Sequence, residues 1–143
     1  MAFFKKSPPE TKSSRMNNQR LDELIRIVST EVAGDPGYWK FSLRGRDLLV
    51  ITDEAHNRMR IMAPVTPQNE LDNDELVRLL EANYDRALDA KYALNDGVLW
   101  SVFTHPLGEL TDDQFTDCID QTATLADNFG DSYASSNLFF GGR

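Results

Sequence analysis

The sequence predicts an α+β fold: a two-layer domain with elements in the order α-β-β-β-α-β-β-α and a mainly antiparallel sheet. Runs of alternating apolar and polar residues follow one another on short turns between residues 38 and 65, as in an antiparallel meander. Two further apolar runs, at 91–95 and 98–104, are joined by Asp96-Gly97, which favours a tight hairpin turn. Segments with apolar residues every three or four positions predict amphipathic helices around these strands.

The length of 143 residues is sufficient for one hydrophobic core. We expect a single domain at 17–130, preceded by a flexible basic leader at 1–16 and followed by a flexible tail at 131–143. The leader is either a disordered terminus or an arm that docks on an acidic surface, including that of its own molecule. Its cationic residues are Lys5, Lys6, Lys12 and Arg15.

The formal net charge of -8 argues against general binding to nucleic acid or to anionic membranes, because like charges repel across the surface. The single cysteine, Cys118, has no partner for an internal disulfide, and the N-terminal residues lack the apolar run of a signal peptide. No apolar run is long enough to span a bilayer. The sequence therefore predicts a cytoplasmic protein without a membrane anchor.

In the first half of the chain, Asn17 and Asn18 are candidate caps for a helix that ends before the stop signal Gly34-Asp35-Pro36-Gly37. Strands are expected at 38–44, 48–52 and 58–65, with turns at 45–47 and 54–57, and Pro64 and Pro67 are expected to end the meander. The apolar stripe of the first helix is expected to consist of Leu21, Leu24, Ile25, Val28 and Val32.

In the second half, a helix is expected to begin at 72–74, and another to begin after Thr111, whose hydroxyl is a candidate N-cap. The predicted inward stripe of the earlier helix is Leu76, Val77, Leu80, Tyr84, Ala87 and Leu88. That of the later helix is Phe115, Ile119, Thr122, Ala126 and Phe129, with Cys118 and Leu125 beside it.

Two of the strand segments, 48–51 and 98–103, are apolar on both faces, although a sheet with one solvated face should alternate. Something is therefore expected to cover the second face: the last helix, a symmetric copy of the chain or a bound peptide. A homodimer is the expected answer, because twofold pairing is the commonest assembly of soluble proteins. The alternative is a sheet with helices on both sides.

The element order, the size and the acidity resemble those of the class I type III secretion chaperones, the Tir chaperone superfamily, and of their relatives in the YbjN group. The resemblance covers residues 19–129 and rests on RMRIMAP at 58–64 and ALNDGVLW at 93–100. It implies an acidic cytoplasmic homodimer that holds an extended segment of a client protein in apolar grooves, without ATP hydrolysis or a cofactor. The alternative that it leaves open is a regulatory or scaffold domain of the YbjN-like group in an unrelated pathway.

The candidate partner-binding residues are aromatic and methionine side chains on the strands, which offer large contact areas. They are Tyr38, Trp39, Met62, Trp100 and Phe103. Aromatic residues at strand spacing are also typical of a core, and Trp39 and Phe41 are the ones most expected to be internal.

An enzyme is the competing class, with Cys118 as nucleophile and His105 or His56 as base. Cys118 lies on the apolar side of its predicted helix, where a thiol is inert, and the two histidines have no metal-ligand spacing to it. We therefore predict neither catalysis nor a metal site. The acidic residues near 72–75 lack the glycine and the glutamate of a calcium loop, and those at 112–120 are typical of a solvated helix face.

Four arginines, Arg44, Arg46, Arg58 and Arg60, fall at neighbouring strand ends and are expected to lie close together. Such a basic patch would bind an acidic peptide or a nucleic acid. Alternatively, the arginines pair with the carboxylates of the adjacent strands and turns.

Overall fold

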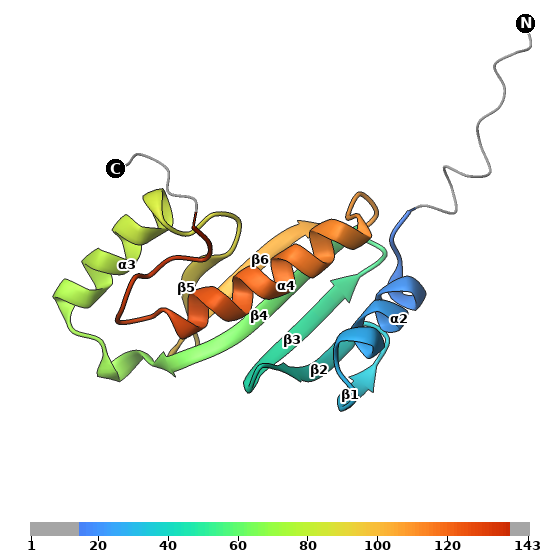
Figure 1. Ribbon diagram of the computed structural model, residues 1–143, viewed down its shortest axis with the longest axis horizontal. Coiled ribbons are helices and arrows are strands. Elements are labelled where there is room, and N and C mark those ends of the chain that lie inside the picture. The colour runs from blue at the N-terminus through green and yellow to red at the C-terminus, as the bar shows by residue number, and fades with distance from the viewer. Residues whose placement is uncertain (1–14, 138–143) are drawn as a thin grey trace, which may run out of the picture.

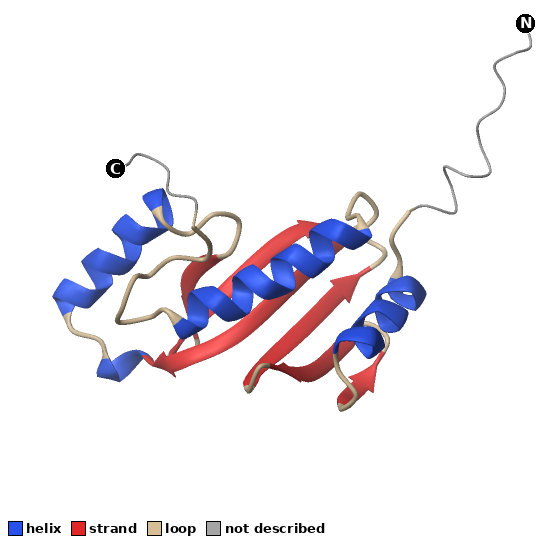
Figure 2. Ribbon diagram, in the orientation of Figure 1, coloured by secondary structure: helices blue, strands red, loops and turns tan. Residues whose placement is uncertain are grey.

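The computed structural model describes residues 15–137, which form one antiparallel sheet with helices packed on one of its faces (Figures 1 and 2). The sheet has the order β1-β2-β3-β4-β6-β5. Its strands are β1 (Val32–Asp35), β2 (Tyr38–Leu43), β3 (Arg46–Asp53), β4 (Arg58–Pro67), β5 (Lys91–Asn95) and β6 (Val98–Pro106). The helices are α2 (Asn18–Val28), the 3-10 turn η2 (Gln68–Glu70), α3 (Asn73–Asp85) and α4 (Asp112–Asp127). The predicted α+β class is confirmed.

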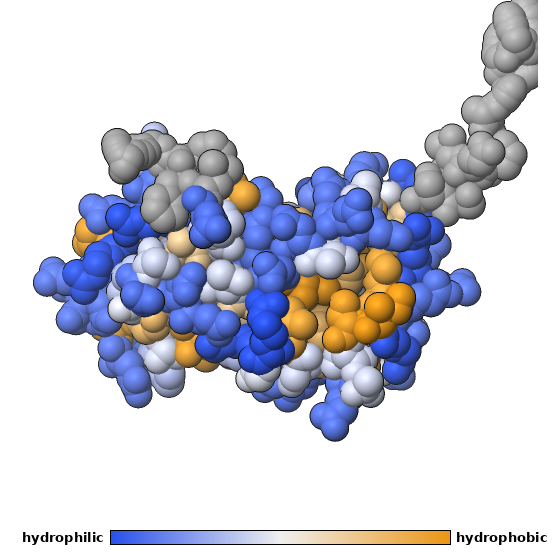
Figure 3. Space-filling model, in the orientation of Figure 1, coloured by the Kyte–Doolittle hydropathy of each residue, from blue (hydrophilic) through white to orange (hydrophobic). Residues whose placement is uncertain are grey.

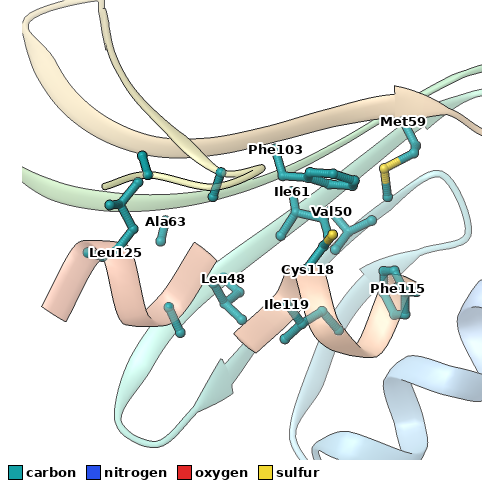
Figure 4. Packing of buried hydrophobic residues seen from close by; sticks show 14 of the residues in the cluster. Leu48, Val50, Met59, Ile61, Ala63, Phe103, Phe115, Cys118, Ile119 and Leu125 are labelled. Atoms are coloured by element: carbon teal, nitrogen blue, oxygen red, sulfur yellow. The ribbon is translucent and has the colours of Figure 1, made fainter. Parts of the chain in front are cut away.

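The core lies between the sheet and α4, which crosses β4 and β6 in Figure 1. Trp39, Val50, Ile61 and Phe103 face one another across four neighbouring strands and are all buried. Of the predicted stripe, Phe115, Ile119, Thr122 and Ala126 are buried on α4, whereas Phe129 lies beyond the end of the helix and is partly buried. Figure 4 shows side chains of α4 that meet this face of the sheet. The labelled ones are Phe115, Cys118, Ile119 and Leu125.

Two hydroxyl groups of the sheet bond to main-chain oxygens of α4 and so fix the helix in one position on the sheet. The buried Ser101 hydroxyl of β6 donates to the carbonyl oxygen of Thr122 at 2.9 Å, and the Tyr92 hydroxyl of β5 donates to that of Leu125 at 2.8 Å. Such buried pairs specify geometry, because an unpaired polar group in the same place would cost its desolvation energy. Burial also raises the pKa of Tyr92 well above its usual range, and the nearby Tyr133 adds to the shift.

The structure contains a strand that the sequence did not predict. The first helix ends at Val28, and Val32 belongs to β1, which pairs with β2. Gly34 adopts a φ of +95°, and a Cβ at this position would clash with the carbonyl oxygen of Tyr38. The stop signal at 34–37 is therefore partly a strand and partly a hairpin turn, and glycine permits this close approach.

Strand β4 also differs from the prediction, because it continues through Pro64 as far as Pro67. The pairing with β6 shifts between Pro64 and Thr66, which marks a β-bulge. Proline is tolerated at a bulge because the ladder lacks one hydrogen bond there. Pro64 therefore redirects the strand instead of ending it.

The predicted inward stripe of α3 is wrong at three positions. Val77, Leu80 and Tyr84 are 54%, 71% and 77% exposed, whereas Leu79 and Ala82 are the buried residues of this helix. Helix α3 lies beyond the β5 side of the sheet and contacts only that strand closely (Figure 1). Its outer apolar face consequently has no cover in the described part of the chain.

Residues at both ends of the described range, Met16 and Tyr133 to Ser135, pack on the domain. The backbone N–H of Met16 donates to the carbonyl oxygen of Gly108, and its side chain is buried. At the other end, Tyr133, Ala134 and Ser135 are buried beside the end of α3. Residues 1–14 and 138–143 lie outside the described part, so the expected flexibility of leader and tail stays a prediction there. None of the described helices has the length and apolar character that a membrane span requires.

Candidate partner-binding surfaces

The helix face of the molecule carries an apolar patch between α2 and α4 (Figure 3). Helix α2 is held to the sheet by Trp39, whose indole N–H donates to Asp22 at 2.9 Å, and to the start of α4 by a bidentate Arg20–Asp112 pair at 2.8 Å. The apolar side chains of this region that pack on the core while keeping part of their surface exposed are Leu24, Val28, Val32 and Leu43. We call this set the α2 patch.

Three ion pairs link α4 to neighbouring elements around the α2 patch. Arg20 binds Asp112 at the start of α4, while Arg44 binds Asp120 and Arg46 binds Asp127 further along the helix, each at 2.8 Å. The hydrogen bond from Arg20 lowers the pKa of Asp112, so this carboxylate stays ionised at neutral pH. The patch thus has an apolar floor with a charged rim, which is the usual anatomy of a protein interface.

The two margins of the sheet differ in whether they have room for another strand. Strand β1 pairs with β2 on one side, and within the described residues no strand lies on its other side. At the opposite margin, the Asn83 amide of α3 accepts from the Tyr92 N–H of β5 at 2.8 Å and donates to its carbonyl oxygen at 3.0 Å. The Asn83 side chain therefore interrupts the β5 edge, whereas β1 is open to strand addition.

A second apolar surface lies where α3 meets β5. Between the two elements is a hollow of about 350 Å³ that is lined mainly by leucines, and Leu80 and Leu94 are exposed at its margin. The Lys91 ammonium donates to the carbonyl oxygens of Asn83 and Ala87 and so secures the end of α3 to β5. We call the exposed residues Val77, Leu80, Tyr84 and Leu94 the α3 stripe.

The five sequence-predicted partner residues divide between the two sheet faces. Trp39 and Phe103 are buried beneath the helices, as the core alternative for aromatic strand residues implies. Tyr38, Met62 and Trp100 lie on the opposite face, which we call the open face, because in the described chain no helix covers it. Tyr38 is exposed, and Met62 and Trp100 are half-buried. Whether these residues contact a partner stays a prediction.

The four arginines do not form the single patch that their sequence positions suggested. Arg44 and Arg46 lie at the β2–β3 turn and bind carboxylates of α4, while Arg58 and Arg60 lie on β4 and form no ion pair with the other described residues. Pairing with Asp47, Asp53 or Glu54 is not seen for any of them among the described contacts. Of these four arginines, Arg58 and Arg60 are the two without a carboxylate partner in the described part of the chain.

The side chain of Cys118 lies inside the core and not in an open site. Burial, with the nearby Asp89 and Asp117 carboxylates, raises the pKa of its thiol to about 12. His105 stacks on Phe103 and bonds to the carbonyl oxygen of Pro106, while His56 bonds to Asp53, so neither imidazole is paired with the thiol. The thiol is protonated at neutral pH and is not an activated nucleophile.

Asp89, Asp117 and Cys118 bring three possible metal ligands within 4.8 Å of one another. The buried Gln121 already bridges this group, because its amide N–H₂ donates to Asp89 at 3.0 Å and to Asp117 at 2.9 Å. The carbonyl oxygen of the same side chain accepts from the backbone N–H groups of Asp89 and Ala90. The arrangement joins α4 to the loop before β5, which is a structural role.

Comparison with solved structures identifies the fold. The chain is similar to the type III secretion chaperone SycH of Yersinia pestis, solved with a fragment of YscM2, with a TM-score of 0.59 at 12% identity, over 78% of this chain and 98% of that one. It is also similar to a chain of the HopA1–SchA chaperone–effector complex, with a TM-score of 0.57 at 12% identity, over 87% and 98% of the two chains. A chain of the ExsC–ExsE complex gives 0.58 at 13% identity, over 89% and 100%.

The chain therefore has the fold of the type III secretion chaperones, as its sequence resemblance predicted. No protein-family model and no curated protein sequence matches it significantly.

Several residues that shape these surfaces escaped the sequence analysis. Asn83 sits in the middle of a predicted helix and Gln121 in the middle of another, so nothing local distinguishes them from solvated polar residues. Gly34 had a usable signal, because an isolated glycine close to a strand indicates close backbone approach. Three residues of the α3 stripe, Val77, Leu80 and Tyr84, were visible as apolar periodicity but were assigned to the inward face of the helix.

Proposed function

We propose that this chain is a non-catalytic binding domain that holds an extended segment of a client protein, in the manner of a type III secretion chaperone, and acts as a homodimer. The observation that carries the proposal is the open outer edge of β1 beside the α2 patch. A client segment added as a strand to β1 would gain main-chain hydrogen bonds. Its apolar side chains would then fill the α2 patch, where the surrounding ion pairs favour particular polar neighbours.

The likeness to chaperones solved with bound protein partners supports this proposal. SycH was solved with a YscM2 fragment, and the SchA structure is a chaperone–effector complex. The burial and protonation of Cys118 weigh against a thiol enzyme, and no step of the proposed binding uses ATP or a cofactor. We expect the protein in the cytoplasm, where newly made clients are present. The alternative function is a scaffold of the YbjN-like group, which would retain its partner permanently.

The α3 stripe is the surface that we assign to dimerisation. Val77, Leu80 and Tyr84 follow one face of α3, and Leu94 of β5 adds to the same apolar area. A twofold axis beside α3 would bring the two copies of this self-complementary surface together. It would also leave both β1 edges at the outside of the dimer, accessible to one continuous client.

The client-binding proposal is tested with a pair of glycine variants. Gly34→Ala introduces a methyl group that clashes with the Tyr38 carbonyl and should displace β1, whereas Gly45→Ala at a similar positive φ meets no atom within 4 Å. A client is first captured from lysate of the source organism, then purified and titrated by calorimetry. We expect Gly34→Ala to lose binding and Gly45→Ala to retain it. Equal binding by both variants would contradict strand addition at β1.

The dimer is tested by light scattering over a range of protein concentrations. Leu80→Glu places a charge in the α3 stripe and should convert the dimer to a monomer. Ile27→Glu is the matched control, because Ile27 is 78% exposed on α2 and lies away from α3. A wild-type chain that is monomeric at every concentration would refute the homodimer. Suppression of client aggregation at substoichiometric amounts separates a chaperone from a scaffold, which forms only a stable complex.

A further inference from the structure

The cationic side chains of the described domain differ between the two faces of the sheet. On the helix side and at the margins, the arginines are paired with carboxylates or with Tyr133, and Lys91 is bonded to main-chain oxygens. On the open face, Lys40, Arg58 and Arg60 are exposed, and none of them forms an ion pair with another residue of the described range 15–137. In a chain with a net charge of -8, a face that gathers exposed cations is complementary to an acidic ligand.

Apolar side chains lie between these cations. The register places Ile51 beside Arg60, and Leu49 beside Lys40 on one side and Met62 on the other. Leu49, Ile51 and Met62 are half-buried although no element covers them. Arg58 and Arg60 are two positions apart on β4, which separates them by about 7 Å along the strand. The centre of the face therefore combines aliphatic and cationic side chains, while the exposed carboxylates of Asp35 and Asp47 lie on the same face at the β1 edge and the β2–β3 turn.

A shallow hollow marks one end of this surface. It has a volume of about 460 Å³, and its lining includes Ile51, Arg58, Arg60 and Thr104. Asp53 lies at its rim, opposite Arg58 in the strand register. The Asp53 carboxylate accepts instead from the ring and the backbone N–H of His56, which lower its pKa. It does not neutralise Arg58, whose guanidinium remains available.

We propose that the open face of β2–β4 is a second binding site, specific for a protein segment that alternates acidic and apolar side chains. Spaced carboxylates would pair with Lys40, Arg58 and Arg60, while apolar side chains would cover Leu49 and Ile51. The acidic surface around the site would repel a nucleic acid, whose phosphates would also leave the aliphatic side chains exposed to water. A second copy laid face to face would oppose the same cations, and the leader, with Lys5, Lys6 and Lys12, has the wrong charge.

This site is separate from the β1 edge and the α2 patch. The α2 patch lies on the helix face of the sheet, whereas this site lies on the opposite face, away from the viewer in Figure 1. It would allow the chain to bind an acidic segment of a client or of a second protein while β1 is occupied. The arrangement also explains why the strand at 48–51 is apolar on both sides: Leu48 and Val50 belong to the core, while Leu49 and Ile51 contribute to the contact surface.

The experiment uses a fluorescent ten-residue peptide of alternating leucine and glutamate, with fluorescence anisotropy as the readout. The test variant is Arg58→Gln with Arg60→Gln. The matched control is Arg44→Gln with Arg46→Gln, which removes the same charge from arginines that are paired with α4. We expect the test variant to bind the peptide about tenfold more weakly than wild type and the control by less than about twofold, because each lost ion pair contributes modestly. Added salt should weaken wild-type binding.

Four results would overturn the proposal. The first two are an equal loss of peptide affinity in the two double variants and equal affinity of the wild type for a leucine–lysine peptide. The other two are tighter binding of a ten-nucleotide oligothymidylate than of the leucine–glutamate peptide, and conversion of a wild-type dimer to a monomer by the test variant. The last result would assign the face to a second copy. Circular dichroism melting of every variant shows that the fold is retained. Gly34→Ala should bind the peptide like wild type, so failure of the β1 proposal and failure of this one are distinguishable.

Discussion

Helices α3 and α4 begin with the same local sequence signals, but their apolar faces lie in different environments. Each starts with a capping box, Asp72 with Glu75 in α3 and Thr111 with Gln114 in α4. Each was predicted to bury an apolar stripe. In α4 the stripe lies against β4 and β6, while the outer residues of α3 face solvent. Helical periodicity therefore shows that a helix has an apolar face, but not whether the same chain covers it.

The difference follows from where each helix meets the sheet. Helix α4 crosses the middle of the sheet, so its apolar face is opposite a complete layer of strand residues (Figure 4). Helix α3 lies at the margin, where β5 is the strand that it mainly contacts, and one narrow band of side chains around Leu79 and Ala82 makes that contact. The remaining apolar surface is left for an intermolecular contact.

The largest effect should come from truncating the α4 face. Phe115 is 1% exposed, so Phe115→Ala should lower the free energy of unfolding by about 3–5 kcal/mol, through lost burial and the cavity left behind. Urea denaturation, followed by tryptophan fluorescence, measures this change in the free energy of unfolding. A loss below about 1 kcal/mol would show that α4 is not packed on the sheet as described.

The second effect is a dependence of stability on pH between 8.5 and 10 that comes from the buried thiol of α4. The pKa of the Cys118 thiol is about 12 in the folded chain and about 8.5 in an unfolded one, so the folded state favours the protonated thiol. This contribution is fully present below pH 8.5 and falls by about 1.4 kcal/mol per pH unit above it.

Urea titrations between pH 8.5 and 10 measure that slope, with Cys118→Ala as the control that should remove it. The upper limit matters because the raised pKa of Tyr92 acts in the same direction above pH 10, its ordinary value. An identical slope in wild type and Cys118→Ala would mean that the thiol is accessible to solvent.

The N-caps of α3 and α4 provide a third test, because the two caps are alike whereas the packing of the two helices on the sheet differs. Thr111→Ala and Asp72→Ala each remove a side-chain acceptor for an N–H of the first turn, with a cost of about 1 kcal/mol for each helix. We expect Thr111→Ala to lower global stability, and Asp72→Ala mainly to accelerate amide exchange within α3. Slower global unfolding of either variant than of wild type would contradict the expected direction.

The smallest effect is expected on the outer side of α3. In a dilute sample that contains only monomer, Leu80→Ala should change the free energy of unfolding by less than about 0.5 kcal/mol, because Leu80 is already 71% exposed. Its neighbour Leu79 is buried and serves as the internal control, with an expected loss of about 2–5 kcal/mol for Leu79→Ala. Equal losses at the two positions would place Leu80 in the core.

The parts of the fold that the sequence predicted are those determined by neighbouring residues. The cap at Thr111, the Asp96-Gly97 turn and the stripe around Phe115 and Ile119 depend on spacing along one segment. Strand β1 was missed because Gly34 and Asp35 look like a helix terminator until β2 is in place beside them. The strand through Pro64 was shortened for a similar reason, since the bulge exists only relative to β6.

The binding surfaces were harder to predict, because they depend on what lies beside a strand in space. Tyr38, Trp39, Met62, Trp100 and Phe103 were selected by residue type, and the register then separated them onto opposite faces. The four arginines are a similar case: two are bound to α4 and two are not. Sequence spacing identifies alternation within a strand but does not say which neighbouring element neutralises a charge.

The Asn83 amide at the β5 margin bears on how the molecule avoids forming fibres. Endless growth of a sheet from copy to copy would require the β1 margin of one molecule to join the β5 margin of the next. Asn83 already occupies the outward main-chain groups of Tyr92, so that joint is interrupted at its centre. An edge that is free to receive a client at one end of the sheet is thus compatible with a chain that does not polymerise, and Asn83→Ala would remove that protection.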